Sequence, residues 1–409
     1  MVQSDRHRRE VHIVPAPEKA THQLTRRSNA RFILRTVYES GPVSRAAIAR
    51  ATGLTRTTVS EIVEDYITEG LMAEVGVGPS TGGKAPILLE VPADARHLIG
   101  VDVDRDRISG AIVNLRGQIR ARASRDLAGC DGAAALRELG SLALALTRAS
   151  SEPLVGIGIG TPGLVETTTG RVYWAVGLDW RNVPLGEDLA KLTGLPVVVV
   201  NDSQAAAMAE WAFGRHEASS AMIVIKVGEG IGAGIVLGGR LYTGDVSGAG
   251  EIGHTRVGEG TASCRCGSTG CLETVASLRA VLERIQELLP AQPGTRLTGR
   301  PVTRESVLEA FRSGDPFVRD IVLDSAVPLG RVIGAVIGTL GARDVVLVGP
   351  MTDFGPSWLE QVRAEARRSA LTLLTERAVI EIGTTGEDVV ELGAAAMLMT
   401  SQLGLAFAA

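Results

Sequence analysis

Apolar residues recur at helical spacing in three consecutive segments near the N-terminus, residues 31–41, 43–53 and 54–70. Gly41-Pro42 and Gly53 separate the segments, and both positions disfavour a continuing helix. The third segment has Thr55 as a natural N-cap and Gly70 as a left-handed stop. Its apolar residues fall on one helical face, and these are Val59, Ile62, Val63, Tyr66 and Ile67. The pattern predicts three short helices.

Two β-prone runs follow, LMAEV at 71–75 and ILLEV at 87–91, and they flank the turn-rich segment GVGPSTGGKAP. This pattern predicts a hairpin. Three helices and a hairpin together predict a winged helix-turn-helix over residues 26–91. Residues 1–25 lack periodicity, and we expect them to form a flexible basic arm.

Beyond Pro92, strand patterns alternate with helical segments, which indicates α/β architecture. Residues 98–119 and 221–244 share one layout of strand, tight turn, strand, short turn and strand. The repeat predicts two lobes, 92–200 and 201–409, and we expect a C-terminal helix to return to the first lobe. Paired lobes of this kind resemble the actin-like sugar kinases, whose duplicated ribonuclease H-like fold implies a hinged ligand site.

Composition narrows the class of protein. In 409 residues, 45% are hydrophobic and 22% charged, which excludes global disorder. No uninterrupted apolar run is long enough to span a bilayer, and the first residues contain no apolar signal core. We therefore expect a cytoplasmic protein with no membrane partner. The net charge is −4, yet residues 1–56 hold 11 Arg or Lys against 4 Asp or Glu. This local excess indicates an anionic partner.

The basic region and the predicted helices favour operator DNA as that partner. Thr55–Ser60 would begin a recognition helix, whose N-terminal residues reach bases and phosphates in such domains. Lys84, flanked by Gly82 and Gly83, would bring the wing close to the backbone. The predicted DNA contacts are Arg56, Thr57, Thr58, Ser60 and Lys84. The alternative is a helical bundle used only for dimerisation.

Three of the four cysteines crowd into the glycine-rich segment CRCGSTGC. Cys264, Cys266 and Cys271, with His254 ten residues upstream, offer three thiolates and one imidazole, a set typical of tetrahedral zinc. Four protein ligands leave no open coordination position, so the predicted zinc is structural and a zinc hydrolase is disfavoured. The alternative is a group of unmetallated, redox-active thiols. Cys130 stands alone and is interpreted as a buried or incidental thiol.

The motifs EIGH at 251–254, C-x-C-G-x-x-G-C-x-E at 264–273, and Asn201-Asp202 after a valine strand resemble the ROK family of repressors and sugar kinases. The resemblance covers residues 28 to about 405. It implies that His254 and the three cysteines bind zinc. It also implies a sugar site, for which carboxylate and amide groups are suited, formed by Asn201, Asp202, Glu251, His254 and Glu273. Asp202 would alternatively cap the following helix.

The nucleotide-binding motifs of such kinases are altered here. In place of D-x-G-G-T, whose glycine amides hold the triphosphate, the chain has Asp102-Val103-Asp104-Arg105-Asp106. Glu229 replaces a small hydroxyl residue, and Gly349-Pro350 replaces a glycine pair and removes an amide donor. Asp202, the general base of the kinases, is retained. The sequence therefore favours a sensor over an enzyme.

Two segments match phosphate-loop patterns, but we interpret neither as a phosphate site, and the first is part of the predicted wing hairpin. Gly78–Lys84 matches G-x-x-x-x-G-K, but Ala85 replaces the metal-binding hydroxyl and Pro86 prevents the helix that would follow. Gly158, Gly160 and Gly163 match G-x-G-x-x-G, with Pro162 inside the motif, and we interpret them as a strand end and turn.

These observations predict a sugar-responsive transcriptional regulator, most simply a repressor of carbohydrate genes. A homodimer or homotetramer would bind a palindromic operator, and a sugar or sugar phosphate between the lobes would release it. The alternative is an ATP-dependent hexose or N-acetylhexosamine kinase with an added DNA-binding domain, in which Asp202 is the base.

Overall fold

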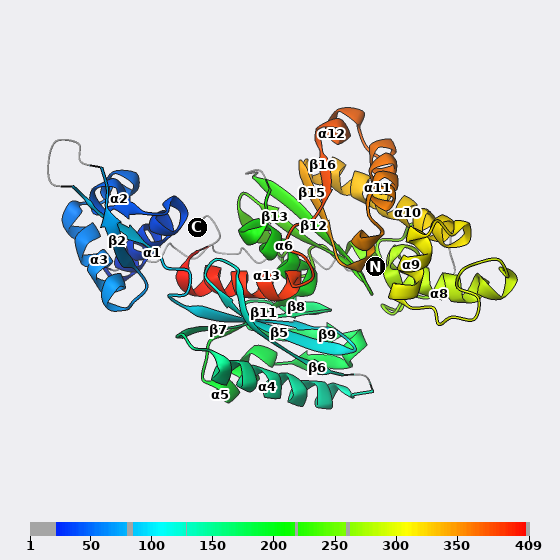
Figure 1. Ribbon diagram of the computed structural model, residues 1–409, viewed down its shortest axis with the longest axis horizontal. Coiled ribbons are helices and arrows are strands. Elements are labelled where there is room, and N and C mark those ends of the chain that lie inside the picture. The colour runs from blue at the N-terminus through cyan, green and yellow to red at the C-terminus, as the bar shows by residue number, and fades with distance from the viewer. Residues whose placement is uncertain (1–21, 80–84, 128, 217–219, 259–261, 406–409) are drawn as a thin grey trace, which may run out of the picture. The chain divides into compact units, whose positions relative to one another are not determined.

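The computed structural model describes residues 22–79, 85–127, 129–216, 220–258 and 262–405 (Figure 1). The chain divides into two compact units. The first holds the described residues up to Glu69 and those of Glu74–Glu90, and the second holds Gly70–Ala73 and the described residues from Val91 onward.

The first unit consists of three helices and a small sheet, as the hydrophobic pattern predicts. One residue from each helix, Ile33, Ile48 and Val63, is fully buried in its core. The strands lie in the order β1-β3-β2, which makes the unit a winged helix-turn-helix. The elements are α1 (His22–Ser40), β1 (Val43–Ser44), α2 (Arg45–Thr52), α3 (Arg56–Thr68), β2 (Ala73–Val77) and β3 (Ile87–Glu90).

Local signals fix the ends of these helices. The hydroxyl of Ser44 accepts from the backbone N–H of Ala47 at the start of α2, and Gly53 ends that helix at φ 70°. The hydroxyl of Thr55 accepts from the N–H of Thr58 at the start of α3, as predicted. Gly70 adopts φ 70°, the left-handed conformation expected of a stop.

The first helix begins earlier than the sequence pattern indicates. Residues 22–25, assigned to the flexible arm, belong to α1. Their polar character hides the helical period, but no glycine or proline interrupts residues 22–40, so the helix extends toward the N-terminus. The rest of the predicted arm lies outside the described residues.

The first lobe of the second unit contains a five-stranded sheet with the order β11-β7-β4-β5-β6. β4 runs antiparallel to β5 and parallel to β7, and β7 runs parallel to β11. Helices α4 (Gly132–Ala149) and α5 (Leu185–Thr193) lie on one side of the sheet (Figure 1). The strands are β4 (His97–Val103), β5 (Arg107–Asn114), β6 (Ile119–Asp126), β7 (Leu154–Thr161) and β11 (Val197–Asn201).

The second lobe repeats this sheet, with the order β14-β13-β12-β15-β16 and the same pattern of parallel and antiparallel neighbours. The predicted duplication is therefore present. One face packs into a core with α10 (Pro316–Leu340) and α11 (Pro356–Arg368). The strands are β12 (Ala221–Val227), β13 (Ile231–Leu237), β14 (Arg240–Tyr242), β15 (Asp344–Val348) and β16 (Val379–Ile382).

Helices α6 (Asp202–Phe213) and α13 (Val389–Leu398) pack against each other between the two sheets (Figure 1). α13 lies on β4 and β7 of the first lobe, and α6 lies on β12 and β13 of the second. A Cβ at Gly158 would lie 2.0 Å from the carbonyl oxygen of Ala394, so this strand glycine is required for close helix packing. Gly158 and Gly160 thus serve packing, and the interpretation that they bind no phosphate agrees with their place in β7.

The remaining elements extend both lobes. In the first lobe a small antiparallel sheet consists of β8 (Leu164–Glu166), β9 (Arg171–Ala175) and β10 (Trp180–Val183), with the short helix η1 (Val176–Leu178). The helical part of the second lobe contains η2 (Ile252–His254), α7 (Glu273–Ala276), α8 (Leu278–Leu288), η3 (Leu289–Ala291), α9 (Arg304–Arg312), η4 (Pro350–Phe354) and α12 (Thr372–Arg377). The short η5 (Met399–Leu403) directly follows α13.

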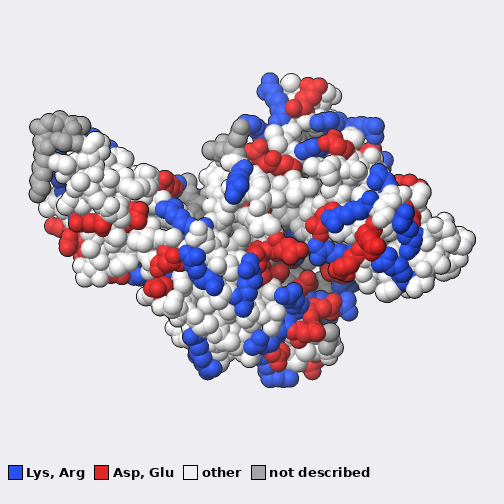
Figure 2. Space-filling model, in the orientation of Figure 1, with Lys and Arg blue, Asp and Glu red and all other residues white. Residues whose placement is uncertain are grey.

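Among the described residues, α10 is the one helix whose length and apolar composition would suffice to cross a membrane. Half of its most apolar stretch is buried, and Val322, Leu329 and Ile333 are fully enclosed by the core of the second lobe. Acidic and basic side chains are intermixed over the second unit (Figure 2). α10 therefore has the environment of a core helix.

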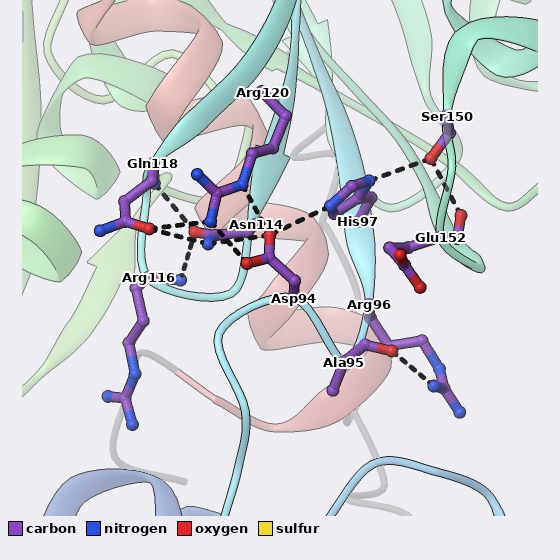
Figure 3. A network of polar contacts seen from close by, with 10 residues as sticks. All are labelled: Asp94, Ala95, Arg96, His97, Asn114, Arg116, Gln118, Arg120, Ser150 and Glu152. Atoms are coloured by element: carbon purple, nitrogen blue, oxygen red, sulfur yellow. Dashed lines mark hydrogen bonds and ion pairs between the residues drawn. The ribbon is translucent and has the colours of Figure 1, made fainter.

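A polar network stabilises the start of the second unit (Figure 3). The carboxylate of Asp94 accepts two hydrogen bonds from the guanidinium of Arg120, at 2.6 and 2.5 Å, and further bonds from His97 and Asn114. The bonds from Arg120 are the main cause of a lowered pKa of Asp94. The other ring nitrogen of His97 faces the Ser150 hydroxyl at 3.1 Å. The network connects the segment before β4 to β6 and to the end of α4.

Candidate functional site

The four predicted metal ligands come together in the second lobe. The ligand atoms of His254, Cys264, Cys266 and Cys271 all lie within 4.8 Å of one another. Nδ1 of His254 lies 3.5 Å from Sγ of Cys264, and Sγ of Cys266 lies 3.8 Å from Sγ of Cys271. In a tetrahedral site, bonds of about 2.3 Å to sulfur and about 2.0–2.1 Å to nitrogen place a nitrogen and a sulfur ligand roughly 3.6 Å apart and two sulfur ligands roughly 3.8 Å apart. These two separations match that geometry, and the remaining ones, all within 4.8 Å, would need only small side-chain adjustments to close around such an ion.

Backbone geometry around the cysteines explains the spacing of the motif. Gly267 and Gly270 adopt φ of 90° and 70°, conformations that other residues rarely tolerate. The N–H of Cys264 donates to the carbonyl of Ser268, and the N–H of Gly267 donates to the carbonyl of Cys264. These turns fold the segment back so that Cys264, Cys266 and Cys271 point to one place. Cys130, interpreted as buried or incidental, is exposed.

His254 faces both the cysteine cluster and the predicted sugar residues. Its Nδ1 points to Cys264, whereas its Nε2 lies 3.7 Å from the Glu251 carboxylate. The pKa of Glu251 is raised to about 7, first by burial and then by the negative charges of Asp202 and Glu273. The carboxylates of Asp202 and Glu273 are therefore close enough to Glu251 for their charges to affect its ionisation.

Asn201 and Asp202 lie where β11 ends and α6 begins. The side-chain oxygen of Asn201 accepts from the N–H groups of Ser203 and Gln204, at 2.9 and 3.3 Å. Asn201 is therefore the N-cap residue, and not Asp202. Oδ1 of Asp202 also accepts from the N–H of Ser203, at 2.7 Å, while Oδ2 is available for another contact.

The main contact of Asp202 is Lys226 on β12, which the sequence reasoning missed. The two charged groups are 2.7 Å apart, and their side chains are 16% and 20% exposed. Burial opposes ionisation of Asp202, but Lys226 and the hydrogen bonds from Ser203 outweigh it and lower its pKa. A lysine inside the apolar strand AMIVIKV was the available signal, because a cation in such a strand needs a partner.

Glu273 is the other buried acid of the predicted sugar site. It begins α7 directly after the cysteine motif and is 8% exposed. Its carboxylate accepts from the N–H of Ile231 at 3.4 Å and lies 3.4 Å from Arg279 on α8. The sequence analysis did not predict a role for Arg279, since its partner Glu273 lies on the preceding helix. Glu273, which follows the cysteine motif, thus contacts both the start of β13 and helix α8.

The three altered nucleotide motifs line a single cavity of about 530 Å³. It lies in the second unit and is bounded by β4 and β5 of the first lobe and by β12, η4 and α13. Asp102, Asp104, Glu229 and Pro350 all line it, together with Lys226. Anionic side chains therefore occupy the cavity that the three altered motifs form, and they would repel a triphosphate.

In the first unit, α3 presents three of the predicted DNA contacts to solvent, Arg56, Thr57 and Ser60. Thr58 differs, because it is half-buried and its hydroxyl lies 2.9 Å from that of Thr55. Its side chain is part of the helix cap. Lys84 lies outside the described residues.

A histidine of the second lobe lies between two carboxylates, one of which, Glu210, lines the cavity. Nε2 of His216 lies 2.6 Å from Glu210, and Nδ1 lies 2.7 Å from Glu381. Glu210 also accepts from the backbone N–H groups of Thr384 and Thr385. Burial acts to lower the pKa of His216, but the bonds to Glu210 and Glu381 outweigh it and raise that pKa.

We expect this histidine to make stability depend on pH. Because its pKa is higher in the folded state than the ordinary value of 6.5, the stabilisation is complete below about pH 6.5 and is lost as the pH rises through the folded pKa. Thermal melts of His216→Gln from pH 6 to pH 9 should show the largest deficit at pH 6 and a smaller one at pH 9. Glu381→Gln should give the same trend with a smaller deficit. A deficit that is constant with pH would contradict the assignment.

The fold and site define a class of protein: a two-lobed domain of the sugar-kinase type joined to a winged helix-turn-helix. Residues 98–401 match the model of the ROK family. The chain belongs to the ROK family.

Relatives with and without the first unit are found. The chain is 31% identical over 390 residues to a xylose repressor of Caldicellulosiruptor bescii, covering 93% of this chain and 98% of the relative. It is 34% identical over 310 residues to a glucokinase of Halalkalibacterium halodurans, covering 73% of this chain and 93% of that enzyme. A crystal structure of a ROK family transcriptional regulator, described as a homologue of the E. coli MLC protein, matches with a TM-score of 0.83 and 25% identity over 93% of this chain and 98% of that one.

Proposed function

We propose that this chain is a sugar-responsive transcriptional repressor acting in the cytoplasm. The observation that carries the proposal is the combination of an exposed, capped helix of the recognition type with a sugar-kinase cleft in which Lys226 neutralises Asp202. An aspartate held as a carboxylate by a neighbouring lysine accepts hydrogen bonds from sugar hydroxyls, but it is a poor base for deprotonating them. The similarity to a xylose repressor over both units supports this reading.

The proposed effector is a sugar bound by Asn201, Asp202, Glu251, His254 and Glu273. The proposed metal is a structural zinc held by His254, Cys264, Cys266 and Cys271, since three thiolates and one imidazole are ligands that zinc prefers. Zinc would fix the ring of His254 through Nδ1 and leave Nε2 on the side of Glu251. The metal would thereby orient a sugar-binding side chain without taking part in chemistry.

The proposed assembly is a homodimer on a palindromic operator, with Arg56, Thr57 and Ser60 as DNA contacts. Because the sugar residues come from more than one element around the interlobe cleft, the sugar would favour one degree of lobe closure. The sugar can change DNA affinity by no more than the ratio of its affinities for the DNA-binding and the released conformations. We expect sugar binding to release the operator.

The experiment begins by selecting operator fragments from genomic DNA with the purified protein. Binding to a labelled fragment is then followed by fluorescence anisotropy during titration with pentoses, hexoses, N-acetylhexosamines and their phosphates. One sugar should weaken DNA binding, and that sugar should also raise the melting temperature whether or not ATP and magnesium are present. Stabilisation by ATP with ADP release would contradict the proposal and favour a kinase.

Arg56→Ala should weaken operator binding by roughly 5- to 150-fold for each half-site, because a base contact from arginine contributes about 1–3 kcal/mol. Its sequence preference should relax at one base pair of each half-site. Arg35→Ala is the matched control, since it removes the same charge from α1, where Arg35 pairs with Glu39. Equal loss in both variants would assign Arg56 a general electrostatic role instead.

A further inference from the structure

The cavity that replaces the nucleotide site is strongly acidic. Seven of its lining residues are acidic and three are basic. Two of the basic residues already have partners: Lys226 pairs with Asp202, and Arg304 pairs with Asp353. Figure 2 shows acidic atoms gathered where α13 begins in Figure 1. A ligand that fits this charge is a cation.

Four of the acids form no ion pair within the described residues, and these are Asp102, Asp104, Glu229 and Glu391. Arg107, which also lines the cavity, is exposed and offsets their charge only in part. The unpaired acids come from both lobes and from the start of α13. A cation between them would therefore contact groups on both sides of the cleft.

Two of these acids have buried oxygen atoms without a hydrogen-bond partner. Glu391 is 5% exposed, and while one of its oxygens accepts from the Ser109 hydroxyl at 2.6 Å, Oε2 has no partner. Oδ1 of Asp102 is likewise buried and unpartnered. An unsatisfied buried acceptor is costly, so these two atoms point to a missing donor. Burial is the main cause of a raised pKa at Asp102 and Glu391.

The arrangement of the acids favours an organic cation over a metal ion. Among the described residues, no three carboxylates of the cavity gather as a set of metal ligands, whereas His254 and the three cysteines do. Carboxylates spread along a cavity of about 530 Å³ instead suit several N–H donors on one flexible chain.

We propose that this cavity binds a small aliphatic polyamine, a di- or triamine, in place of a nucleotide. The ammonium groups would donate to Asp102 and Glu391 and would be neutralised by Asp104 and Glu229. Since the lining residues come from both lobes, the amine would favour the closed conformation of the cleft. It would thereby act as a second effector of the regulator, in addition to the sugar.

The test uses the full-length protein without DNA or sugar, so its outcome does not depend on the proposed repressor function. Isothermal titration with spermidine and with putrescine at physiological salt should give one saturable site, and both amines should raise the melting temperature. Sodium chloride and magnesium chloride at matched ionic strength should give neither effect. ATP with magnesium should not bind.

Two variants localise the site. Glu391→Gln should weaken spermidine binding roughly tenfold or more, because it removes a charge-assisted hydrogen bond. Glu229→Gln, at an exposed position that leaves the core intact, should weaken it by up to about fivefold. Glu360→Gln, an exposed acid of α11 that pairs with Arg363, is the control and should bind as wild type does.

Three outcomes would overturn the proposal. The first is absence of a saturable heat with either amine. The second is equal affinity in wild type, Glu229→Gln and Glu391→Gln, which would mean general association with acidic surface. The third is binding of ATP with magnesium in competition with spermidine, which would assign the cavity to nucleotide.

Discussion

Replacing Cys266 with serine is expected to abolish zinc binding and to destabilise the second lobe by about 3 kcal/mol. The estimate corresponds to the entropy of the loop that the ion closes between His254 and Cys271, treated as a cross-link of that length. Sugar affinity should fall with it, because His254 would lose the ligand that fixes its ring beside Glu251. Purified wild type should contain one zinc per chain, and the variant none.

The measurements are metal content by mass spectrometry, thermal melting and sugar titration. Cys130→Ser is the matched control, since Cys130 is an exposed cysteine outside the cluster. It should retain zinc, stability and sugar affinity. Wild-type protein purified without zinc, or a Cys266→Ser variant that retains it, would contradict the assignment and favour free thiols.

Replacing Asp202 with asparagine is expected to have two separable effects. The variant should lose about 3 kcal/mol of stability, because the largely buried ammonium of Lys226 keeps its charge but loses its counter-ion. It should also lose sugar affinity by at least tenfold, since a hydrogen bond to a charged acceptor contributes about 1.5–3 kcal/mol. Urea unfolding and sugar titration measure the two effects.

A double-mutant cycle distinguishes them. Asp202→Asn combined with Lys226→Met should recover much of the stability, because neither charge is then buried alone, but it should not recover sugar binding. The exposed pair Glu187–Lys191 on α5 is the control of matched chemistry, and the same cycle there should give almost no coupling. Recovery of sugar binding in the double variant would mean that Asp202 acts only through Lys226.

Much of the fold could be predicted because its signals are local. The Thr55 cap, the glycine stops at Gly53 and Gly70, and the apolar face of α3 depend on residues within a few positions of one another. The duplicated sheet could be recognised for the same reason, since each copy begins with a contiguous strand-turn-strand segment. The cysteine motif and its upstream histidine span 18 residues, and the turns that assemble them lie within that span.

The sequence by itself thus determined the winged helix-turn-helix, the two lobes, the candidate metal ligands and the altered nucleotide motifs. Only the tertiary structure decided which charges are paired. Lys226 reaches Asp202 across 24 residues, and Glu210 reaches Thr384 and Thr385 across more than 170. Sequence spacing carries no information about such partners, because the packing of α6 and α13 between two sheets brings them together. The same packing leaves Asp102 and Glu391 with unpartnered oxygens in one cavity, and burial makes each of these contacts energetically important.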